Sequence, residues 1–375
     1  MGVQRDGNTV TESLLMALTL TKKKNAVVTG LDIESGSVAA TEAHLNGSVA
    51  VSKTAVVPLE PGLVRDGEIL DPAGLGTALK NLFEVHKLSK AVRFGVANQR
   101  VAVRTLRMPL IEKKAERDTA VRFQAQDHIP MPLDQAVLDY QVVGHAEGAG
   151  GARQMDVIIV AARRDMIAKY LETASLAGLR PIGIDLSAFG MIRALWPELA
   201  ASANSAEAAT AAGARLYCGL GSVTNLAVGR GGDCLFTRIS TYGTEAIAQS
   251  LAERAGLTLE HARQWIMHVG LERPLGQLEG DPDKIAATRQ VLTEGVAKLA
   301  DELRLSLEFY GAQEGAVAIE GIVASGPGSA VPGLTDRLRD ELGHHFEVRR
   351  PKALMHLEDP AAARLTLSLG LAVDR

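Results

Sequence analysis

The sequence contains few of the residues that mark metal, redox or stacking sites. Its 375 residues include only two cysteines, Cys218 and Cys234, and their spacing is not that of a metal site. Few cysteines are typical of a reducing compartment, and we expect both to be buried, unreactive thiols. Aromatic residues make up 4% of the chain, which counts against a platform that stacks bases or sugars. The net charge of −4 likewise counts against a nucleic-acid surface.

The start of the chain lacks the patterns of a signal peptide and of a membrane span. The segment ESLLMALTLTKKK has an apolar run of about nine residues followed by lysines, whereas a signal peptide has its positive charge first. A membrane-spanning helix needs about 20 apolar residues. We therefore expect a short amphipathic segment at the protein surface, with weak contact between residues 22–24 and a membrane face as the alternative. We predict a cytoplasmic protein.

Residues 26–100 have the pattern of an α/β unit. Segments rich in β-branched residues predict three strands, and Asn46-Gly47 between the second and third is a strong signal for a two-residue hairpin turn. Asp71-Pro72 then opens a helical stretch with leucines on one face, and the strand AVRFGVA follows. A chain of this length has room for two or more such domains.

A second pattern begins at Val101 and continues to about Arg180. Its order is strand, charged helix, strand, strand and helix, and Pro130 and Pro132 end the charged helix. This order predicts a small inserted α+β subdomain. We expect the charged helix to cover the sheet of that subdomain, and the functional alternative is that it lines a groove for a partner.

The meander pattern returns about 190 residues after its first appearance. Before it, residues 198–213 are rich in alanine and low in complexity, which predicts a linker or exposed loop. The strands that follow again enclose a turn of small residues, and two long helical regions come next. Two copies of one meander indicate a duplicated architecture.

Several segments together resemble one known family. Two meanders with phosphate-type turns, and a late strand that ends in Ser-Gly-x-Gly before a helix, are similar to the actin-like ATPase superfold. In detail the chain resembles PilM, the actin-like protein of type IV pilus assembly, from about Val27 to Val373. FtsA of cell division shares the folded core. The segments that carry the resemblance are DHIPMPLDQAVLDYQVVG, VIIVAARRDMIAKYLETASLAGLRPIGIDLSAFGMIRAL, FTRISTYG and VASGPGSAVPGL.

The resemblance implies an α/β protein of the actin-like superfold, with two lobes of duplicated β-meander/α units and an inserted α+β subdomain. The expected parts are an N-terminal extension (1–25), a first lobe (26–100 and 181–197), the inserted subdomain (101–180), a linker or exposed loop (198–213) and a second lobe (214–375, with a helical subdomain at about 243–315).

In function, the resemblance implies a scaffold. PilM proteins lie under the inner membrane and bind the N-terminal cytoplasmic tail of PilN, an inner-membrane pilus protein, in a groove between the first lobe and the inserted subdomain. We therefore expect an adaptor of a pilus or related secretion platform, peripheral to the inner face of the plasma membrane, with a PilN-like partner. The alternative is an ATP-binding actin-like protein whose nucleotide state regulates that docking.

The resemblance also implies an ATP site between the lobes, where hairpin turns hold the phosphates and carboxylates hold Mg²⁺. Asp32 is the candidate metal residue. Asp185 lies at the acidic position that orients the attacking water in ATP-hydrolysing relatives, and it could instead cap the helix that begins at Ser187. The candidate nucleotide-binding residues are Asp32, Ser35, Ser37, Gly221, Ser222, Thr224, Gly326 and Gly328.

This site departs from the family pattern at several positions. A Glu34 carboxylate that pointed inward, within about 4 Å of a phosphate, would be repelled by about 4 kcal/mol. If it pointed outward, the main cost would be the loss of the backbone conformational freedom that glycine gives the turn. We therefore predict a degenerate cleft without useful hydrolysis, in which ATP and Mg²⁺ are not firmly expected. The departures are Glu34 for glycine and Ala39 for a basic residue in the first turn, Cys218 or Gly219 for aspartate in the second, Arg263 and Ile266 for an acid and a lysine on the ribose-binding helix, and Pro327 within the glycine run.

Overall fold

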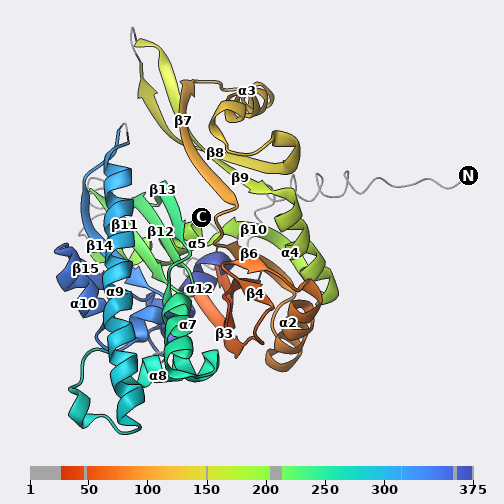
Figure 1. Cartoon of the computed structure of the whole chain (residues 1–375). Helices are drawn as coiled ribbons and strands as arrows, with labels where there is room; N and C mark the ends of the chain where they lie inside the picture. The colour runs from red at the N-terminus through yellow and green to blue at the C-terminus, as the bar shows by residue number, and fades with distance from the viewer. Residues whose placement is uncertain are drawn as a thin grey trace, which may run out of the picture.

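The computed structural model describes residues 27–45, 49–148, 151–202, 213–313, 315–357 and 361–373. These residues form two lobes, each built on a five-stranded mixed sheet, and a smaller subdomain with its own three-stranded sheet, which is at the top of Figure 1. The predicted N-terminal segment, the Asn46-Gly47 turn and most of the predicted linker lie outside the described residues.

The sheet of the first lobe has the strand order β10-β6-β1-β2-β3. Strands β1, β2 and β3 form an antiparallel meander, and β1, β6 and β10 pair in parallel. A two-stranded ribbon, β4 with β5, precedes the first helix. The bounds are β1 (Val28–Ile33), β2 (Ser37–Leu45), β3 (Val49–Pro58), β4 (Val64–Arg65), β5 (Glu68–Ile69), β6 (Ala91–Val96) and β10 (Arg180–Leu186).

The sheet of the second lobe repeats this topology as β13-β12-β11-β14-β15. Strands β11, β12 and β13 form the meander, and β14 and β15 extend the sheet in parallel. Both cysteines are buried here as thiols that form no disulfide, as expected, and burial raises the pKa of the Cys218 thiol to about 12. The bounds are β11 (Ala214–Leu220), β12 (Thr224–Arg230), β13 (Asp233–Ser240), β14 (Ile319–Ser325) and β15 (Phe346–Val348).

Two helices, α2 (Pro72–His86) and α4 (Arg164–Leu176), pack together over the sheet of the first lobe. Helix α2 begins where the sequence predicted, because the Asp71 carboxylate accepts hydrogen bonds from the second and third residues of the helix, each 3.0 Å long. Helix α4 falls within the range predicted for the inserted subdomain, yet it buries Met166 and Tyr170 in the core of the first lobe.

The second lobe carries most of its helices on one face of its sheet. They bury one large aliphatic core against the sheet, and α9 is the longest of the described helices. Shorter elements are the 3-10 helices η2 (Leu133–Gln135), η4 (Leu275–Gln277), η5 (Pro327–Ala330) and η6 (Lys352–Leu354). The α-helices are α7 (Thr244–Ala255), α8 (Leu259–Val269), α9 (Pro282–Gly311), α10 (Leu334–Leu342) and the single turn α11 (Ala361–Arg364).

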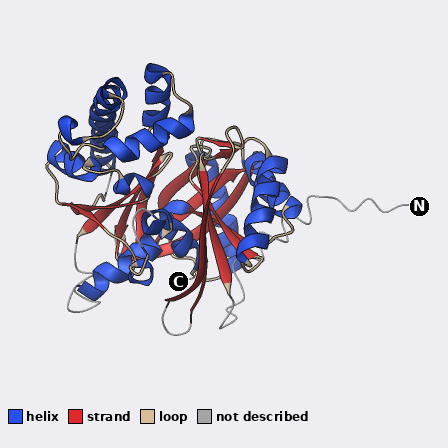
Figure 2. Ribbon diagram, turned by 90° about the horizontal axis from the view of Figure 1, so that it is seen from below, coloured by secondary structure: helices blue, strands red, loops and turns tan. Residues whose placement is uncertain are grey.

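Two helices lie between the sheets and join the lobes (Figures 1 and 2). Helix α5 (Ser187–Ser202) leaves the first lobe and packs on strands of the second, whereas α12 (Thr366–Ala372) leaves the second and packs on strands of the first. They cross so closely that a Cβ on Gly370 would lie 1.8 Å from the carbonyl oxygen of Gly190. Helix α5 also runs into the predicted linker, because the alanine-rich stretch favours helix over an open loop.

The inserted subdomain has the strand order β7-β9-β8, with α3 on one face of the sheet. Only Val121 and Ala125 of α3 are buried, so this charged helix covers the sheet with a narrow apolar stripe and leaves its outer face in solvent. The bounds are β7 (Val101–Pro109), α3 (Lys114–His128), β8 (Ala136–Glu147) and β9 (Arg153–Arg163).

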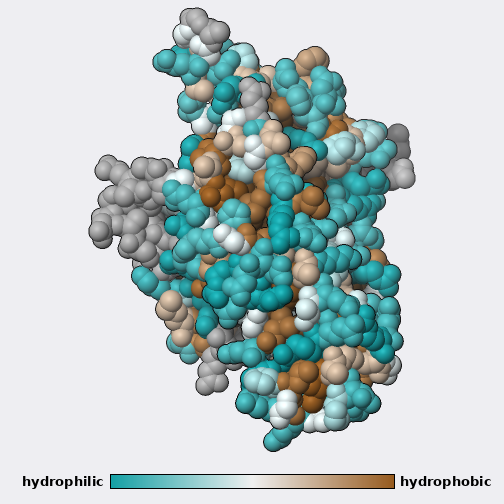
Figure 3. Space-filling view, turned by 60° about the vertical axis from the view of Figure 1, so that its left-hand side comes forward, coloured by the Kyte–Doolittle hydropathy of each residue, from teal (hydrophilic) through white to brown (hydrophobic). Residues whose placement is uncertain are grey.

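The surface in Figure 3 is largely hydrophilic, with apolar patches below the inserted subdomain. Leu305 and Phe309 of α9 are more than half exposed, and the Phe309 ring lies 5.9 Å from that of Phe236. None of the described helices is both long enough and apolar enough to cross a membrane.

Candidate functional site

The two meander turns meet between the lobes. The first turn joins β1 to β2 and contains Glu34, Ser35 and Gly36, and the second joins β11 to β12. The backbone N–H of Ser35 donates to the Ser222 hydroxyl at 3.4 Å, and the backbone N–H of Ser222 donates to the Glu34 carboxylate at 3.2 Å. The tips of the turns therefore bond directly to each other.

The orientation of Glu34, which the sequence left open, is inward. A Cβ built on Gly221 would lie 1.9 Å from Oε1 of Glu34, so the carboxylate rests on the backbone of the second turn in space that only glycine leaves free. Backbone N–H groups of such turns are the donors that hold phosphate in nucleotide sites. A side chain of the protein thus receives the hydrogen bond that a phosphate would receive.

The charges around Glu34 come from both lobes. Burial raises the pKa of Glu34 to about 7, and the Ser222 N–H and the positive charges of Arg364 and Arg263 oppose that rise. Burial, and then the charge of Glu34, raise the pKa of Asp32 well above its ordinary value. Both carboxyl groups of this turn therefore release their protons at a higher pH than ordinary carboxyl groups do.

Two arginines close the sides of the turns. The guanidinium of Arg364, at the end of α11, donates to the Ser37 hydroxyl at 3.3 Å. Arg263 of α8 forms a two-point ion pair with Glu245 of α7, with N–O distances of 2.5 and 3.0 Å. A Cβ on Gly36 would lie 2.6 Å from the guanidinium carbon of Arg263, so the first turn sits against this pair.

A small cavity remains beside the paired turns. Its volume of about 80 Å³ is far below the roughly 300–1,000 Å³ of ligand pockets. Of the candidate nucleotide-binding residues, Ser37 and Ser222 line it. The full lining is Glu34, Gly36, Ser37, Ser222, Thr244, Glu245, Arg263, Ile266, Met267, Pro327, Val331 and Arg364.

The other candidates have structural partners. The Thr224 hydroxyl donates to the Tyr242 carbonyl at 2.7 Å. Gly326 has a φ of 95°, which favours glycine, and a Cβ on Gly328 would lie 2.9 Å from Leu220. These two glycines let the loop after β14 pass close to the end of β11.

Asp185 is engaged by its own neighbourhood. One carboxylate oxygen accepts from the backbone N–H of Leu186 at 2.8 Å, and the other pairs with the guanidinium of Arg193, in the second turn of α5. Asp185 does not line the cavity. These contacts tie the end of β10 to α5 through Arg193.

These residues do not fit a magnesium triphosphate. The Glu34 carboxylate takes the donor that a phosphate would need, Asp32 is a buried carboxyl that favours its proton, and the cavity is too small. Among the described residues, no three His, Cys, Asp or Glu side chains are grouped so as to hold a metal ion. We therefore derive no catalytic step through ATP.

Arg364, Thr244 and Glu245 line the cavity but were not among the residues singled out from the sequence. Arg364 lies 327 residues from its partner Ser37, and no local pattern marks that contact. The hydroxyl and N–H of Thr244 both donate to the Gly221 carbonyl at 2.9 Å. The position of Thr244 directly after Tyr-Gly, at the start of a helix, was the sequence feature that could have identified it as a site residue.

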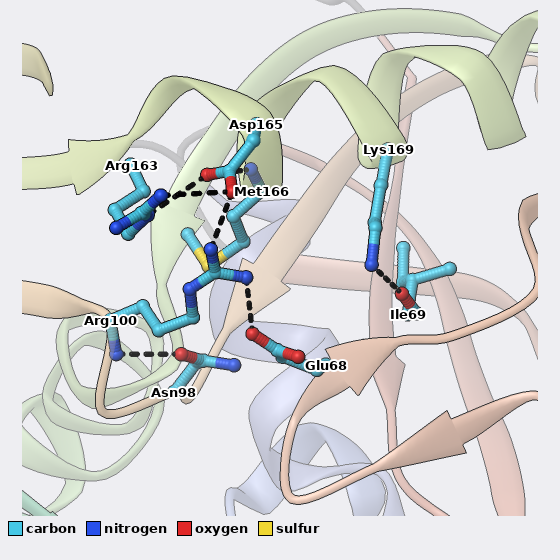
Figure 4. A network of polar contacts seen from close by, with 8 residues as sticks. All are labelled: Glu68, Ile69, Asn98, Arg100, Arg163, Asp165, Met166 and Lys169. Atoms are coloured by element: carbon cyan, nitrogen blue, oxygen red, sulfur yellow. Dashed lines mark hydrogen bonds and ion pairs between the residues drawn. The ribbon is translucent and has the colours of Figure 1, made fainter. Parts of the chain in front are cut away.

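A second polar site joins the first lobe to the inserted subdomain (Figure 4). Arg100, in the loop before β7, bonds to Glu68 of β5 and to Asp165 at the start of α4, the latter at 2.5 Å. Arg163 pairs with the same Asp165 at 3.1 Å. The Arg163 and Arg100 guanidinium groups lower the pKa of Asp165 to about 2. These bonds hold the inserted subdomain in one orientation relative to the first lobe.

The two repeated sheets, the helices that cross between them and the facing turns define an actin-like protein. Residues 30–373 match the family model of the type IV pilus assembly protein PilM. The chain therefore belongs to the PilM family, as its sequence motifs predicted, and its role lies in type IV pilus assembly.

One solved structure agrees with this assignment, and others are similar to the chain at lower identity. The chain is 27% identical to a protein of a PilM–PilN type IV pilus biogenesis complex, with a TM-score of 0.74 over 92% of this chain and 97% of that one. The ethanolamine utilization protein EutJ from Carboxydothermus hydrogenoformans is 12% identical, with a TM-score of 0.54 over 97% and 96% of the two chains. MreB5 of Spiroplasma citri bound to AMPPNP is 13% identical, with a TM-score of 0.46 over 86% and 91%.

Proposed function

We propose that this protein is a scaffold that binds the N-terminal cytoplasmic tail of a PilN-like inner-membrane protein, on the cytoplasmic face of the membrane. Membership of the PilM family supports this proposal, and so does the likeness to the PilM–PilN complex over nearly the whole of both chains. The tail would dock where the first lobe meets the inserted subdomain.

One observation favours a scaffold over an ATPase. The fold is kept in full, including the inserted subdomain, whereas the cleft between the lobes is filled by the protein's own Glu34, Arg263 and Arg364. A protein that worked by nucleotide turnover would need that cleft for the phosphates and the metal. In this proposal the protein binds its partner through surfaces outside the cleft.

The junction at the inserted subdomain has features that suit a peptide. The Arg100 network holds the two parts in one orientation, so a peptide would meet a preformed surface and its binding would not have to order the protein. Away from the Arg100 network, helix α3 of the inserted subdomain exposes charged residues and Phe123, which is 66% exposed on an otherwise polar helix and would extend the docking surface from the junction. An exposed aromatic beside charges is a common anchor at interfaces.

The test is a binding titration of the full chain with a labelled synthetic peptide of the PilN-like tail. We expect binding in the micromolar range that does not change when ATP and Mg²⁺ are added. Absence of binding in both conditions would disprove the scaffold. Binding only with ATP would favour the alternative, in which nucleotide state regulates docking.

A pair of variants tests the place of binding. We expect Phe123→Ala to weaken the peptide about fivefold or more, since a buried aromatic anchor contributes about 1 kcal/mol or more. Val85→Ala is the matched control, because Val85 is 72% exposed on α2 of the first lobe. Equal affinities of the two variants would exclude the outer face of α3 as the docking surface.

A further inference from the structure

We propose that Glu34 is an intramolecular ligand whose carboxylate occupies the anion cradle of the second turn and latches the two lobes together. In an actin-like protein with a nucleotide, the ligand lies between the turns. Here one turn supplies the acceptor and the other supplies the donor. The latch is a property of the cleft alone, so it can be disproved without affecting the proposal on tail binding.

The bonds of the latch run between the lobes in both directions. The second turn donates to the first through the N–H of Ser222, and the first donates to the second through the N–H of Ser35. Ser35 and Ser222 are buried, and Glu34 is half-buried between them. A buried hydrogen bond whose acceptor is removed leaves the donor unsatisfied, which favours opening of the cleft.

The space around the carboxylate fits this role. Gly221 has no Cβ, and one placed there would lie 1.9 Å from Oε1 of Glu34 and 3.1 Å from its carboxyl carbon. The carboxylate therefore sits against the bare backbone of the turn, where it accepts from the N–H of Ser222, while the Gly221 N–H bonds to the Val223 carbonyl within the turn. Arg364 and Arg263 stabilise the negative charge from the two sides.

The structure also indicates what removal of the carboxylate would leave. The N–H of Ser222 and the guanidinium of Arg364 would remain around a space of carboxylate size. A small monovalent carboxylate such as acetate would fit that space and restore the lost bond, whereas chloride lacks the planar pair of oxygens. The latch thus predicts chemical rescue of a variant that lacks it.

The experiment measures backbone amide exchange of segment 219–226 in the full chain. We expect Glu34→Ala to speed exchange of the Ser222 amide about tenfold or more, because that amide is protected in the closed cleft by its hydrogen bond to the Glu34 carboxylate. Acetate should slow that exchange several-fold in the variant and leave the wild type unchanged, with sodium chloride at equal ionic strength as the control. Glu34→Gln keeps a carbonyl acceptor and should stay close to the wild type.

Two outcomes would overturn the latch. One is wild-type protection of Ser222 in Glu34→Ala, and the other is an acetate effect of the same size in the wild type and the variant.

If Glu34→Ala does not fold, Gly221→Ala displaces the carboxylate while keeping residue 34, and its faster exchange at Ser222 supports the latch. Gly276→Ala, with no atom within 4 Å of the added Cβ, is its control, and equal exchange in these two glycine variants disproves the latch.

Discussion

The two lobes have the same strand order, yet the turns that end their first hairpins differ in chemistry. The first turn contributes the Glu34 carboxylate, and the second contributes Gly221 and the N–H of Ser222. In a phosphate site both turns act as donors toward one shared anion. Here the first turn carries the anion itself, so the lobes bond to each other and not through a ligand.

A second difference lies at the crossing of α5 and α12. Each helix leaves one lobe and packs on the other, so the two are equivalent in topology. Their glycines are not equivalent in packing, because a Cβ on Gly370 would overlap the backbone of α5 at 1.8 Å, whereas a Cβ on Gly190 would meet the Leu371 side chain at 3.2 Å and the Leu367 carbonyl oxygen at an ordinary 3.5 Å. Repetition of a fold therefore does not imply repetition of its contacts.

The largest expected effect is on that crossing. Gly370→Ala should lower the free energy of unfolding by about 3 kcal/mol, because the methyl group would force the backbones of two buried helices apart. Gly190→Ala should change it by less than about 1 kcal/mol, because a leucine side chain can move by a few tenths of an ångström. Denaturant unfolding of the two variants measures both. Equal losses would show that the crossing is symmetric after all.

The next effect is a dependence of stability on pH that arises in the first turn. Burial raises the pKa of Glu34 from 4.5 to about 7 in the folded protein, so the folded state holds a proton that the unfolded state releases. The free energy of unfolding therefore includes a contribution of about 1–3 kcal/mol from this proton. That contribution is present in full below about pH 4.5 and is lost as the pH rises through about 7. Asp32, Glu245, Arg263 and Arg364 face the same carboxyl group.

Unfolding of the wild type and of Glu34→Gln between pH 4.5 and 8 isolates this contribution. The variant cannot titrate at residue 34, so its stability should fall less over that range than that of the wild type. Glu84→Gln, which removes an exposed carboxylate from α2, away from the turn, serves as the control. A parallel decline in the wild type and Glu34→Gln would show that the first turn does not titrate near neutral pH.

The smallest effect on stability is expected at the inserted subdomain, which only the first lobe carries. Arg100→Ala should cost about 1 kcal/mol, because its partners Glu68 and Asp165 are 29% and 52% exposed and solvent screens the pairs. It should nevertheless weaken the tail peptide several-fold, since the docking surface would lose its fixed orientation. Calorimetry and the peptide titration report the two quantities.

Arg254→Ala is the matched control in the second lobe, where Arg254 joins α7 to α9 through Glu294 at 3.0 Å. It should cost a similar free energy and leave peptide affinity unchanged. If both arginine variants weaken the peptide alike, the loss would reflect general destabilisation and not the junction.

Much of the fold was predictable because its signals are local. The hairpin strands follow from β-branched runs, the start of α2 from Asp71-Pro72, and the end of α3 from the prolines after it. The place of α4 was not predictable, because the apolar face that buries Tyr170 suits the sheet of either the first lobe or the inserted subdomain. The extension of α5 past residue 197 was missed because alanine-rich, low-complexity sequence suits both a helix and a linker.

The candidate site shows the same division. Glu34 was identified from the sequence as a residue unsuited to a phosphate turn, but its inward orientation depends on Gly221, which is 187 residues away. Arg364 carried no signal at all, because the residues before α12 have no pattern that points to Ser37.

The sequence by itself determined the order of the elements, the duplication and the family, and it predicted a second turn without a metal-binding carboxylate. These depend on residue types and short spacings along the chain. Only the tertiary structure decided that the vacated cleft is closed by Glu34 and the two arginines, because that closure arises from contacts between segments far apart in sequence. Their geometry is set by how the lobes pack on α5 and α12.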